Sequence, residues 1–445
     1  MSKVLGIVAE YNPFHNGHLY HIQKSKEITG SDYTIAIISG NFVQRGSVSI
    51  INKWSKAQMA LKNGIDLVIE LPLLYSISSG ENFSDGAIKI LNSLGIVNYL
   101  SFGAETDNIE VLSNLADIIY NEPAEYKTLL STELGKGVSF PVARENAIVE
   151  YIKSDNFKAK NIINNLLKDI HVDTEISDIC KLKKILSSPN NILGIEYLKA
   201  LKKYKSNINP ICIKRFGTSH NEIYLKQNAV ATKENVNAQY YASATAIRDY
   251  INSNNLQSIK KYLPENSYSI LEKNLTDGHI VFNLQPFEKI IFYNLRKMSI
   301  EEIANLPDVS EGLEFSIKKA TNNCNNIQDF IESVKSKRYT QTRLQRIILY
   351  ALLGITKKDM DLSKKVETPY VRILGCNKNG KKLLSEIVSK NANLPVITSV
   401  KKFIDENKNI DLSVMLEKDI FATNVYTLAF KNNSFSNLDF THKIF

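Results

Sequence analysis

The sequence predicts an α/β protein with a Rossmann-like parallel-sheet core, a helical extension and a mixed, basic C-terminal region. Short apolar runs alternate with helical patterns through the first half of the chain, as expected of a parallel sheet with helices on its faces. Residues 107–186 then read mostly as helices with polar breaks, and after about residue 265 helices dominate. The 445 residues, 43% apolar and 23% charged, are sufficient for two or three globular domains.

Individual elements follow from apolar periodicity and from turn residues. Strands of the core are expected at 4–9, 33–38, 66–70, 97–102 and 211–214, and helices at 17–28, 55–63, 86–94 and 192–201. In the C-terminal half we expect a helix at 342–353 and short strands near 370–374 and 424–430. The predicted boundary at residue 265 separates the core, 1–265, with 107–186 as its insertion or extension, from a second region, 266–445.

The most informative motif, His15-Asn16-Gly17-His18, lies where the first helix begins. Free backbone N–H groups and the positive end of the helix dipole favour phosphate at such a position. Residues at i and i+3 share a face, so both imidazoles can donate hydrogen bonds to a phosphate whose charge grows during attack. Two other interpretations are open: metal ligation, because His21 continues the spacing, and ordinary surface histidines on an amphipathic helix.

A second motif, SxTxxR, is formed by Ser243-Ala244-Thr245-Ala246-Ile247-Arg248. Ser243 or Thr245 can cap the following helix, and Arg248 would offer a fixed fork to phosphate oxygens; plain helix capping explains the hydroxyls equally well. The two motifs together resemble the nucleotidyltransferase branch of the HIGH superfamily, whose members direct a nucleophile at the α-phosphate of ATP and release pyrophosphate. Ala244 departs from the pattern, because this position often carries another hydroxyl.

Longer stretches resemble the tRNA(Met) cytidine acetate ligase family. The similarity covers most of residues 1–250, continues more loosely to the C-terminus, and is carried by EYNPFHNGH (10–18), SGNFVQRG (39–46), KWSK (53–56), GIDLVIELP (64–72), FGAE (102–105), PNNILG (189–194) and Lys214-Arg215. The resemblance implies that a ligase activates acetate with ATP to acetyl-adenylate and acetylates N4 of the wobble cytidine of elongator tRNA(Met), giving N4-acetylcytidine. Residues 1–265 would then be the ATP-binding catalytic domain and 266–445 the tRNA-binding region.

The resemblance also implies roles for particular residues. His15 and His18 would stabilise the transition state at the α-phosphate, and Ser243, Thr245 and Arg248 would hold the departing pyrophosphate. The expected ATP contacts are Ile7, Val8, Ala9, Glu10, Tyr11, Asn12, Pro13, Phe14, His15, Asn16, Gly17, His18, Leu19, Tyr20, Gly103, Asn190, Asn191 and Arg215. From the sequence alone, Gly103 is equally a turn glycine, the asparagine pair equally caps a helix, and Arg215 is equally a surface charge.

Most of the positive charge lies downstream of both motifs. The chain has a formal net charge of +9, and residues 251–445 account for +7 of it. Its densest basic stretch, which we call the basic cluster, is interleaved with polar and aromatic residues and suits contact with tRNA phosphates. A solvated helix face is the alternative. The members of the basic cluster are Lys335, Lys337, Arg338, Arg343 and Arg346.

The remaining composition indicates a cytoplasmic protein without membrane association. Four scattered cysteines suit reduced thiols, and no apolar stretch is long enough for a membrane span. No protein metal site is indicated, although Mg²⁺ could neutralise the triphosphate of ATP. An adenylyltransferase acting on a small phosphorylated metabolite or mononucleotide would use the same motifs, whereas a noncatalytic RNA-binding protein would need neither. The residues alone identify neither acetate, nor tRNA(Met), nor an oligomeric state.

Overall fold

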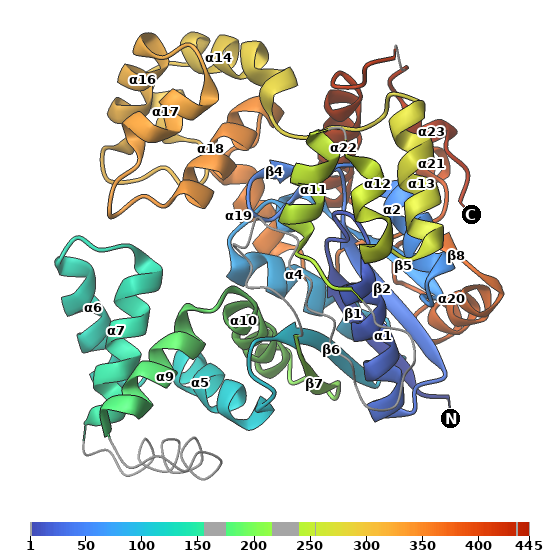
Figure 1. The fold of residues 1–445 in the computed structure, drawn as a ribbon, viewed down its shortest axis with the longest axis horizontal. Helices are drawn as coiled ribbons and strands as arrows, with labels where there is room; N and C mark the ends of the chain where they lie inside the picture. The colour runs from blue at the N-terminus through green and yellow to red at the C-terminus, as the bar shows by residue number, and fades with distance from the viewer. Residues whose placement is uncertain (1, 155–174, 216–239, 254, 433–434, 445) are drawn as a thin grey trace.

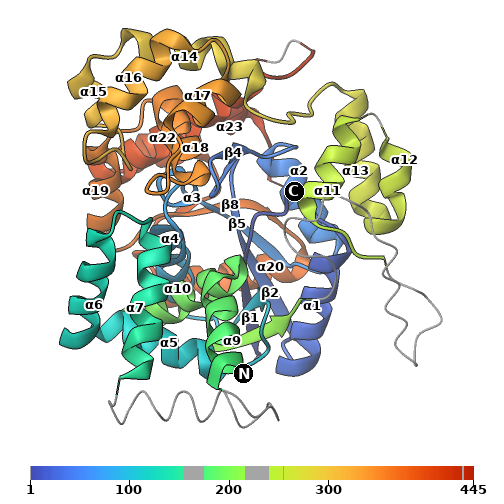
Figure 2. The ribbon, with the colours of Figure 1, turned by 60° about the vertical axis from the view of Figure 1, so that its left-hand side comes forward.

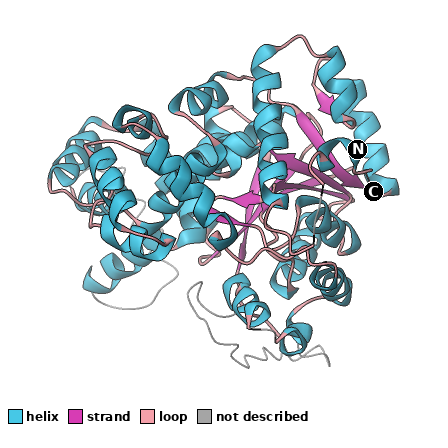
Figure 3. Ribbon diagram, turned by 90° about the horizontal axis from the view of Figure 1, so that it is seen from above, coloured by secondary structure: helices cyan, strands magenta, loops and turns pink. Residues whose placement is uncertain are grey.

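A seven-stranded sheet forms the centre of the molecule in the computed structural model, which describes residues 2–154, 175–215, 240–253, 255–432 and 435–444 (Figures 1 and 3). In spatial order the strands are β7 (Asn209–Lys214), β6 (Tyr99–Ala104), β1 (Val4–Ala9), β2 (Tyr33–Ser39), β5 (Leu67–Leu71), β8 (Val371–Cys376) and β9 (Val396–Ile397). The first five in this order run parallel, and β8 pairs antiparallel with β5. The carboxyl ends of the five parallel strands therefore meet at one edge, where such sheets bind ligands.

Side chains alternate along the strands between two hydrophobic cores. Ile35 and Ile37 of β2 pack into the first core, whereas Ala36 and Ile38 pack into the second. This follows because successive residues of a strand point to opposite faces of the sheet. Both faces of the sheet are thus apolar, and both must be covered by helices.

Different helices cover the two faces. Those that pack into the first core include α3 (Leu73–Ser76), α4 (Gly80–Ser93), α5 (Ile109–Asn121) and α10 (Pro189–Lys203). The helical extension α6 (Ala124–Gly135), α7 (Phe140–Lys153) and α9 (Glu175–Ser187) lies beside α5 and α10 (Figure 2). Those of the second core are α1 (Asn16–Thr29), α2 (Lys53–Lys62), α11 (Ala244–Asn252), α12 (Leu256–Ile259), η1 (Lys260–Tyr262) and α13 (Glu265–Thr276).

The C-terminal part adds a helical lobe and further helices around the sheet (Figure 1). The lobe contains η2 (Gln285–Phe287), α14 (Glu288–Lys297), α15 (Ile300–Ala304), α16 (Leu313–Asn323), α17 (Ile327–Val334), α18 (Gln341–Leu353) and α19 (Lys357–Lys365). After it come α20 (Lys378–Lys390), α21 (Val400–Glu406), α22 (Ile410–Thr427) and α23 (Leu438–Thr441). None of the described helices is long and apolar enough to cross a membrane. A separate antiparallel hairpin, β3 (Phe42–Val43) and β4 (Ser47–Val48), follows β2.

The predicted α/β core is confirmed, but several of the predicted elements and bounds differ. The expected strand at 424–430 is wrong, because most of that segment belongs to α22, whose buried residues Leu412, Met415, Leu416 and Asp419 recur at helical spacing. The expected parallel strand at 97–102 starts and ends two residues later, as β6. In addition, residues 266–445 supply β8 and β9 to the central sheet, so the sheet extends beyond the predicted boundary at residue 265. Part of the predicted insertion, 155–174, lies outside the described residues.

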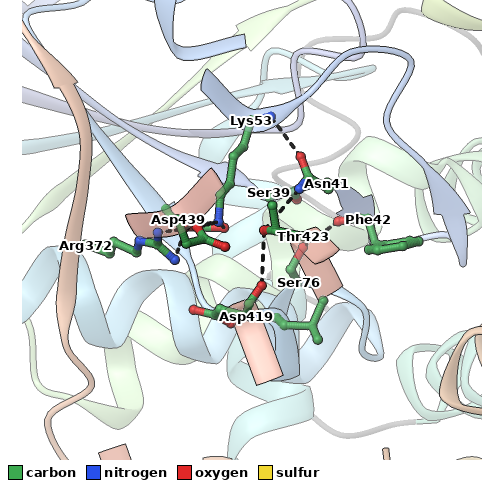
Figure 4. Close-up of polar contacts among 12 residues, drawn as sticks. Ser39, Asn41, Phe42, Lys53, Ser76, Arg372, Asp419, Thr423 and Asp439 are labelled. Atoms are coloured by element: carbon green, nitrogen blue, oxygen red, sulfur yellow. Dashed lines mark hydrogen bonds and ion pairs between the residues drawn. The ribbon is translucent and has the colours of Figure 1, made fainter. Parts of the chain in front are cut away.

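Four buried charged residues join the C-terminal part to the sheet, and three of them, Lys53, Arg372 and Asp439, are labelled in Figure 4. We call Lys53 (α2), Glu70 (β5), Arg372 (β8) and Asp439 (α23) the ion cluster. The Lys53 ammonium lies 2.9 Å from Glu70 and 2.7 Å from Asp439, and the Arg372 guanidinium pairs with the same two carboxylates. Two cations thus face two anions, which offsets the cost of burying each charge.

A second set of hydrogen bonds extends the ion cluster toward the loop after β2. Asn41 accepts the backbone N–H of Lys53 at 2.8 Å and donates to the Thr423 hydroxyl at 3.2 Å. Asp419, one turn before Thr423, accepts from the Leu73 backbone N–H at 2.7 Å and from the Tyr370 hydroxyl. Burial raises the pKa of Asp419 to about 7. Helix α22 is therefore tied by polar contacts to the segment that leads into the β3–β4 hairpin.

Candidate active site

A pocket of about 270 Å³ opens at the carboxyl edge of the sheet. Its walls come from the end of β1, the start of α1, the β3–β4 hairpin, the ends of β6 and β7, and the starts of α10 and α11. Both sequence motifs contribute: His15 and His18 from the first, and Ser243, Thr245 and Arg248 from the second. The fold thus brings together, in one cavity, the residues whose sequence pattern indicates phosphate chemistry.

The start of α1 fixes the two histidines side by side. His15 is the N-cap residue, and its Nδ1 accepts the backbone N–H of Gly17 at 3.0 Å. The Nδ1 of His18 accepts the backbone N–H of His15 at 3.2 Å, and the two rings stack with centroids 3.8 Å apart. A Cβ at Gly17 would lie 2.9 Å from the His15 ring, so any other residue would force this ring to move. The same imidazoles therefore cap α1 and line the pocket.

These hydrogen bonds also determine where each imidazole carries its proton. A neutral ring has one N–H, so a ring whose Nδ1 accepts a hydrogen bond is protonated on Nε2. Burial, and then the nearby Arg215 and Arg248, lowers the pKa of His15 to about 3. Burial likewise lowers the pKa of His18 well below its usual value, with His15 as the next cause. Both rings are neutral at pH 7, and each has an Nε2–H left to donate.

The metal-ligand interpretation of this motif is not supported by the geometry. His21 Nε2 lies 2.8 Å from the Ser101 hydroxyl, and the Nδ1 atoms of His15 and His18 are occupied by backbone N–H groups. Within the part of the chain that the structure describes, no group of three His, Cys, Asp or Glu side chains is placed to hold a metal ion.

The SxTxxR motif forms the first turn of α11. Ser243 is its N-cap, and the Ser243 hydroxyl accepts the backbone N–H of Ala246 at 3.0 Å. Arg248 donates to the Asn12 carbonyl at 2.8 Å and to the Thr245 hydroxyl at 3.1 Å. The second motif is thereby fastened to the loop that precedes the first. Capping is confirmed for Ser243, while Thr245 and Arg248 line the pocket.

Gly103, Asn190 and Arg215 line the wall built by β6, β7 and α10. The Asn190 amide oxygen accepts from Arg215 at 3.0 Å, and its amide nitrogen donates to Glu105 at 2.6 Å. Asn191 is fully buried, accepts the Glu105 backbone N–H at 2.9 Å and is not part of the pocket lining. Of the two asparagines, Asn190 is therefore the one placed to meet a ligand. Neither is the N-cap of α10, a position occupied by Ser188.

The predicted ATP-binding segment 7–20 is only partly in the pocket. The pocket is lined by Val8, Ala9, Glu10, Tyr11, Asn12, His15, Gly17, His18 and Tyr20, whereas Ile7, Pro13, Phe14, Asn16 and Leu19 lie outside its lining. Ile7 and Phe14 belong to the second core. The Asn16 amide donates to the carbonyls of Tyr240 at 3.0 Å and Lys261 at 2.9 Å. The segment thus alternates between residues that face the cavity and residues that hold it in place.

Sequence reasoning missed the contribution of the β3–β4 hairpin. Val43, Gln44, Arg45 and Ser47 all line the pocket. The available signal is the SGNFVQRG run, which carries part of the family resemblance but by itself indicates no role for these residues. Five other unpredicted lining residues, His21, Phe102, Leu193, Lys214 and Ala244, lie in or beside the motifs and stretches quoted above, which by themselves assign them no ligand contact. No sequence signal distinguishes the rest, which are Phe83, Tyr197, Ile213, Tyr241 and Ala242.

The basic cluster divides into two groups around the junction of α17 and α18. Lys335, Lys337 and Arg338 are exposed, with Arg338 in an ion pair with Glu311 at 2.9 Å. Arg343 donates to the Asp308 carbonyl at 2.8 Å, and Arg346 pairs with the Asp308 carboxylate at 2.7 Å. The last two arginines are therefore engaged in holding the lobe together, and the exposed three are the better placed to meet a polynucleotide.

Comparisons with known proteins agree on one family. The family model described as HIGH Nucleotidyl Transferase matches residues 2–439. The tRNA(Met) cytidine acetate ligase of Caldanaerobacter subterraneus subsp. tengcongensis is 43% identical over 99% of both chains, and that of Acetivibrio thermocellus is 40% identical over 99% of both. Among solved structures, Thermotoga maritima TmcAL in its apo form superimposes with a TM-score of 0.87 at 32% identity, covering 99% of this chain and 98% of that chain.

A second Thermotoga maritima TmcAL structure, bound with alpha-thio ATP, superimposes with a TM-score of 0.84 at 32% identity and the same coverage. The similarity therefore extends over nearly the whole chain, from the sheet to the C-terminal lobe. The chain belongs to the HIGH nucleotidyltransferase family and, within it, to the tRNA(Met) cytidine acetate ligases.

Proposed function

We propose that this chain is an ATP-dependent ligase that joins acetate to N4 of the wobble cytidine of elongator tRNA(Met), forming AMP and pyrophosphate. The observation that carries the proposal is the full-length similarity to tRNA(Met) cytidine acetate ligases in a chain whose two phosphate motifs meet in one pocket. Since tRNA is the proposed acceptor, the cytoplasm is the proposed site of action.

In the first step, an acetate oxygen attacks the α-phosphorus of ATP. The bond from that phosphorus to the bridging oxygen breaks, and pyrophosphate leaves with the electron pair. The Nε2–H groups of His15 and His18 donate to the α-phosphate oxygens as their charge grows, while Arg248 and Thr245 face the departing pyrophosphate. Each donor acts on charge that develops in the transition state, and losing one such donor typically costs about 10²–10³ in rate.

In the second step, the cytidine N4 amine attacks the carbonyl carbon of acetyl-adenylate. The bond from this carbon to the AMP oxygen breaks, AMP leaves, and N4 loses one proton to solvent. The exposed members of the basic cluster, Lys335, Lys337 and Arg338, are proposed to contact tRNA phosphates during this step, because their side chains are accessible to a polyanion.

Mg²⁺ enters this scheme as part of the ATP substrate. The donor set of the pocket does not fit a protein-held divalent cation, because Glu10 is the only carboxylate among its described lining residues and already accepts the Gln44 backbone N–H at 2.8 Å. Arginine and neutral imidazole groups dominate around the phosphate site instead. We therefore assign no step to a resident metal.

The test is to incubate the purified protein with ATP, carboxyl-labelled acetate and elongator tRNA(Met), and to analyse the nucleosides by mass spectrometry. We expect labelled N4-acetylcytidine together with equal amounts of AMP and pyrophosphate. A metabolite adenylyltransferase would instead leave AMP attached to its product. Formation of ADP and phosphate, or absence of label from cytidine, would refute the proposal.

A further inference from the structure

Two walls of the active-site pocket approach β1 from opposite sides. The sheet order β7-β6-β1-β2 places Gly103, Asn190 and Arg215 on the side of β6 and β7, whereas Arg45 reaches the pocket from the hairpin that follows β2. The first wall holds three of the expected ATP contacts. The hairpin wall lies across β1 from these three residues.

Arg45 differs from the other pocket arginines in its partners. Arg215 donates to Asn190, and Arg248 donates to Asn12 and Thr245. The half-buried Arg45 makes no hydrogen bond or ion pair with any residue that the structure describes. Its charge instead disfavours the charged forms of Arg215 and Arg248, whose pKa values are lowered mainly by burial and further by Arg45. Arg45 thus repels both of the other guanidinium groups, and an anion bound between them would relieve this repulsion.

The hairpin holds Arg45 on a rigid support. Pairing of Val43 with Ser47 leaves a three-residue loop, Gln44 to Gly46, in which Gly46 has a φ of +77°. The Gln44 backbone N–H donates to Glu10 at 2.8 Å, and its side chain donates to the Ser78 carbonyl at 3.0 Å. On the other side of Arg45, Gly46 packs so closely on α18 that a Cβ would lie 2.5 Å from the Arg346 backbone nitrogen. The loop is thus fixed on both sides of Arg45 without help from the Arg45 side chain.

We propose that Arg45 binds the carboxylate of acetate and holds it in line for attack on the α-phosphorus; this inference rests on the function proposed above. A planar guanidinium matches a carboxylate with two parallel hydrogen bonds. It also offsets the repulsion between an anionic nucleophile and the triphosphate, which is the main obstacle to bringing these two substrates together. Val43 of the same hairpin lines the pocket and offers apolar surface to the methyl group.

The test compares Arg45→Gln and Arg45→Lys with the wild-type protein and with Arg296→Gln, a matched control on α14 outside the pocket lining. For each protein, the KM for acetate, the KM for tRNA and the equilibrium dissociation constant of ATP are measured. We expect Arg45→Gln to raise the KM for acetate about 10- to 100-fold, as for loss of a hydrogen-bonded charged partner. The KM of Arg45→Lys for acetate should lie between those of the wild type and of Arg45→Gln, because lysine keeps the charge but lacks the two parallel donors of the guanidinium group. ATP binding and the KM for tRNA should stay unchanged.

Other outcomes would overturn the inference in distinguishable ways. A weaker affinity for ATP with an unchanged KM for acetate would make Arg45 a phosphate ligand. A raised KM for tRNA alone would make it a contact to the RNA, and no change in any constant would remove it from substrate binding. If the wild-type protein itself fails to acetylate tRNA, the proposed function fails. If the wild-type protein acetylates tRNA and the Arg45 variants match it, only the Arg45 inference fails.

Discussion

Replacing Asp439 by Asn should destabilise the protein far more than the loss of an ordinary surface charge. Asp439 pairs with Lys53 at 2.7 Å and with Arg372, and none of the four side chains in the ion cluster is more than 5% exposed. Asparagine keeps the shape but leaves two buried cations with Glu70 as their remaining ion-pair partner. Breaking a buried pair in this way typically costs about 3–5 kcal/mol, because an uncompensated charge stays buried. We expect the free energy of unfolding to fall by about this amount.

The single tryptophan of the chain provides the assay. Trp54 stacks on His442, three residues after Asp439, with ring centroids 4.5 Å apart, so its fluorescence reports release of the C-terminal segment during urea denaturation. Asp405→Asn, on the exposed surface of α21, is the matched control and should match the wild type. The double variant Lys53→Met/Asp439→Asn should cost less than the sum of its single changes, because it restores one cation to one anion. A cost for Asp439→Asn below about 1 kcal/mol, as for exposed pairs, would refute this reasoning.

Two further predictions concern pH and tRNA. Burial lowers the folded pKa of His15 to about 3, so the contribution of its neutral ring to stability is fully present above the unfolded pKa and is lost as pH falls toward 3. Asparagine at this position keeps a capping oxygen but does not titrate, so the stability of the wild type should fall more steeply than that of His15→Asn below about pH 6.5, by up to about 1.4 kcal/mol per pH unit. Equal slopes in urea titrations would contradict this. Changing Lys335, Lys337 and Arg338 to Ala should weaken tRNA binding and reduce the slope of log affinity against log salt concentration by about one for each phosphate that is no longer neutralised. Acetyl-adenylate formation should be unaffected, and Lys401→Ala on α21 is the control. An unchanged slope would leave the exposed lysines and arginine as solvated charges.

Local sequence signals predicted which residues meet in the pocket better than they predicted which distant strands pair. The histidine and SxTxxR motifs could be found because helix starts have short, recognisable patterns, and the structure brings His15, His18 and Arg248 into one pocket. The pairing of β5 with β8 could not be predicted, since strands far apart in the chain carry no mark of their partner. The strand expected at 424–430 was wrong because that segment read alone hides the helical period that begins at Ile410.

Arg45 shows why part of the site escaped prediction. A lone arginine in a polar turn is usually a solvated charge, and nothing in its neighbourhood indicates that the turn folds over a cavity. Its position becomes meaningful only once Gly46 is seen against α18, a helix about three hundred residues later in the chain. Sequence patterns describe the residues of one element well, whereas the position of the Arg45 side chain depends on how three elements pack together.

The place of β8 in the sheet has a consequence for how the chain is made. One edge of β5 stays unpaired until residues 371–376 have been synthesised, which at about 5–20 residues per second takes roughly 15–60 s. An apolar strand with a free edge is a template for pairing with other chains. During that interval Glu70 has Lys53 as a partner but lacks Arg372, which arrives with β8. The nascent N-terminal half therefore exposes this strand edge until residues 371–376 reach the sheet.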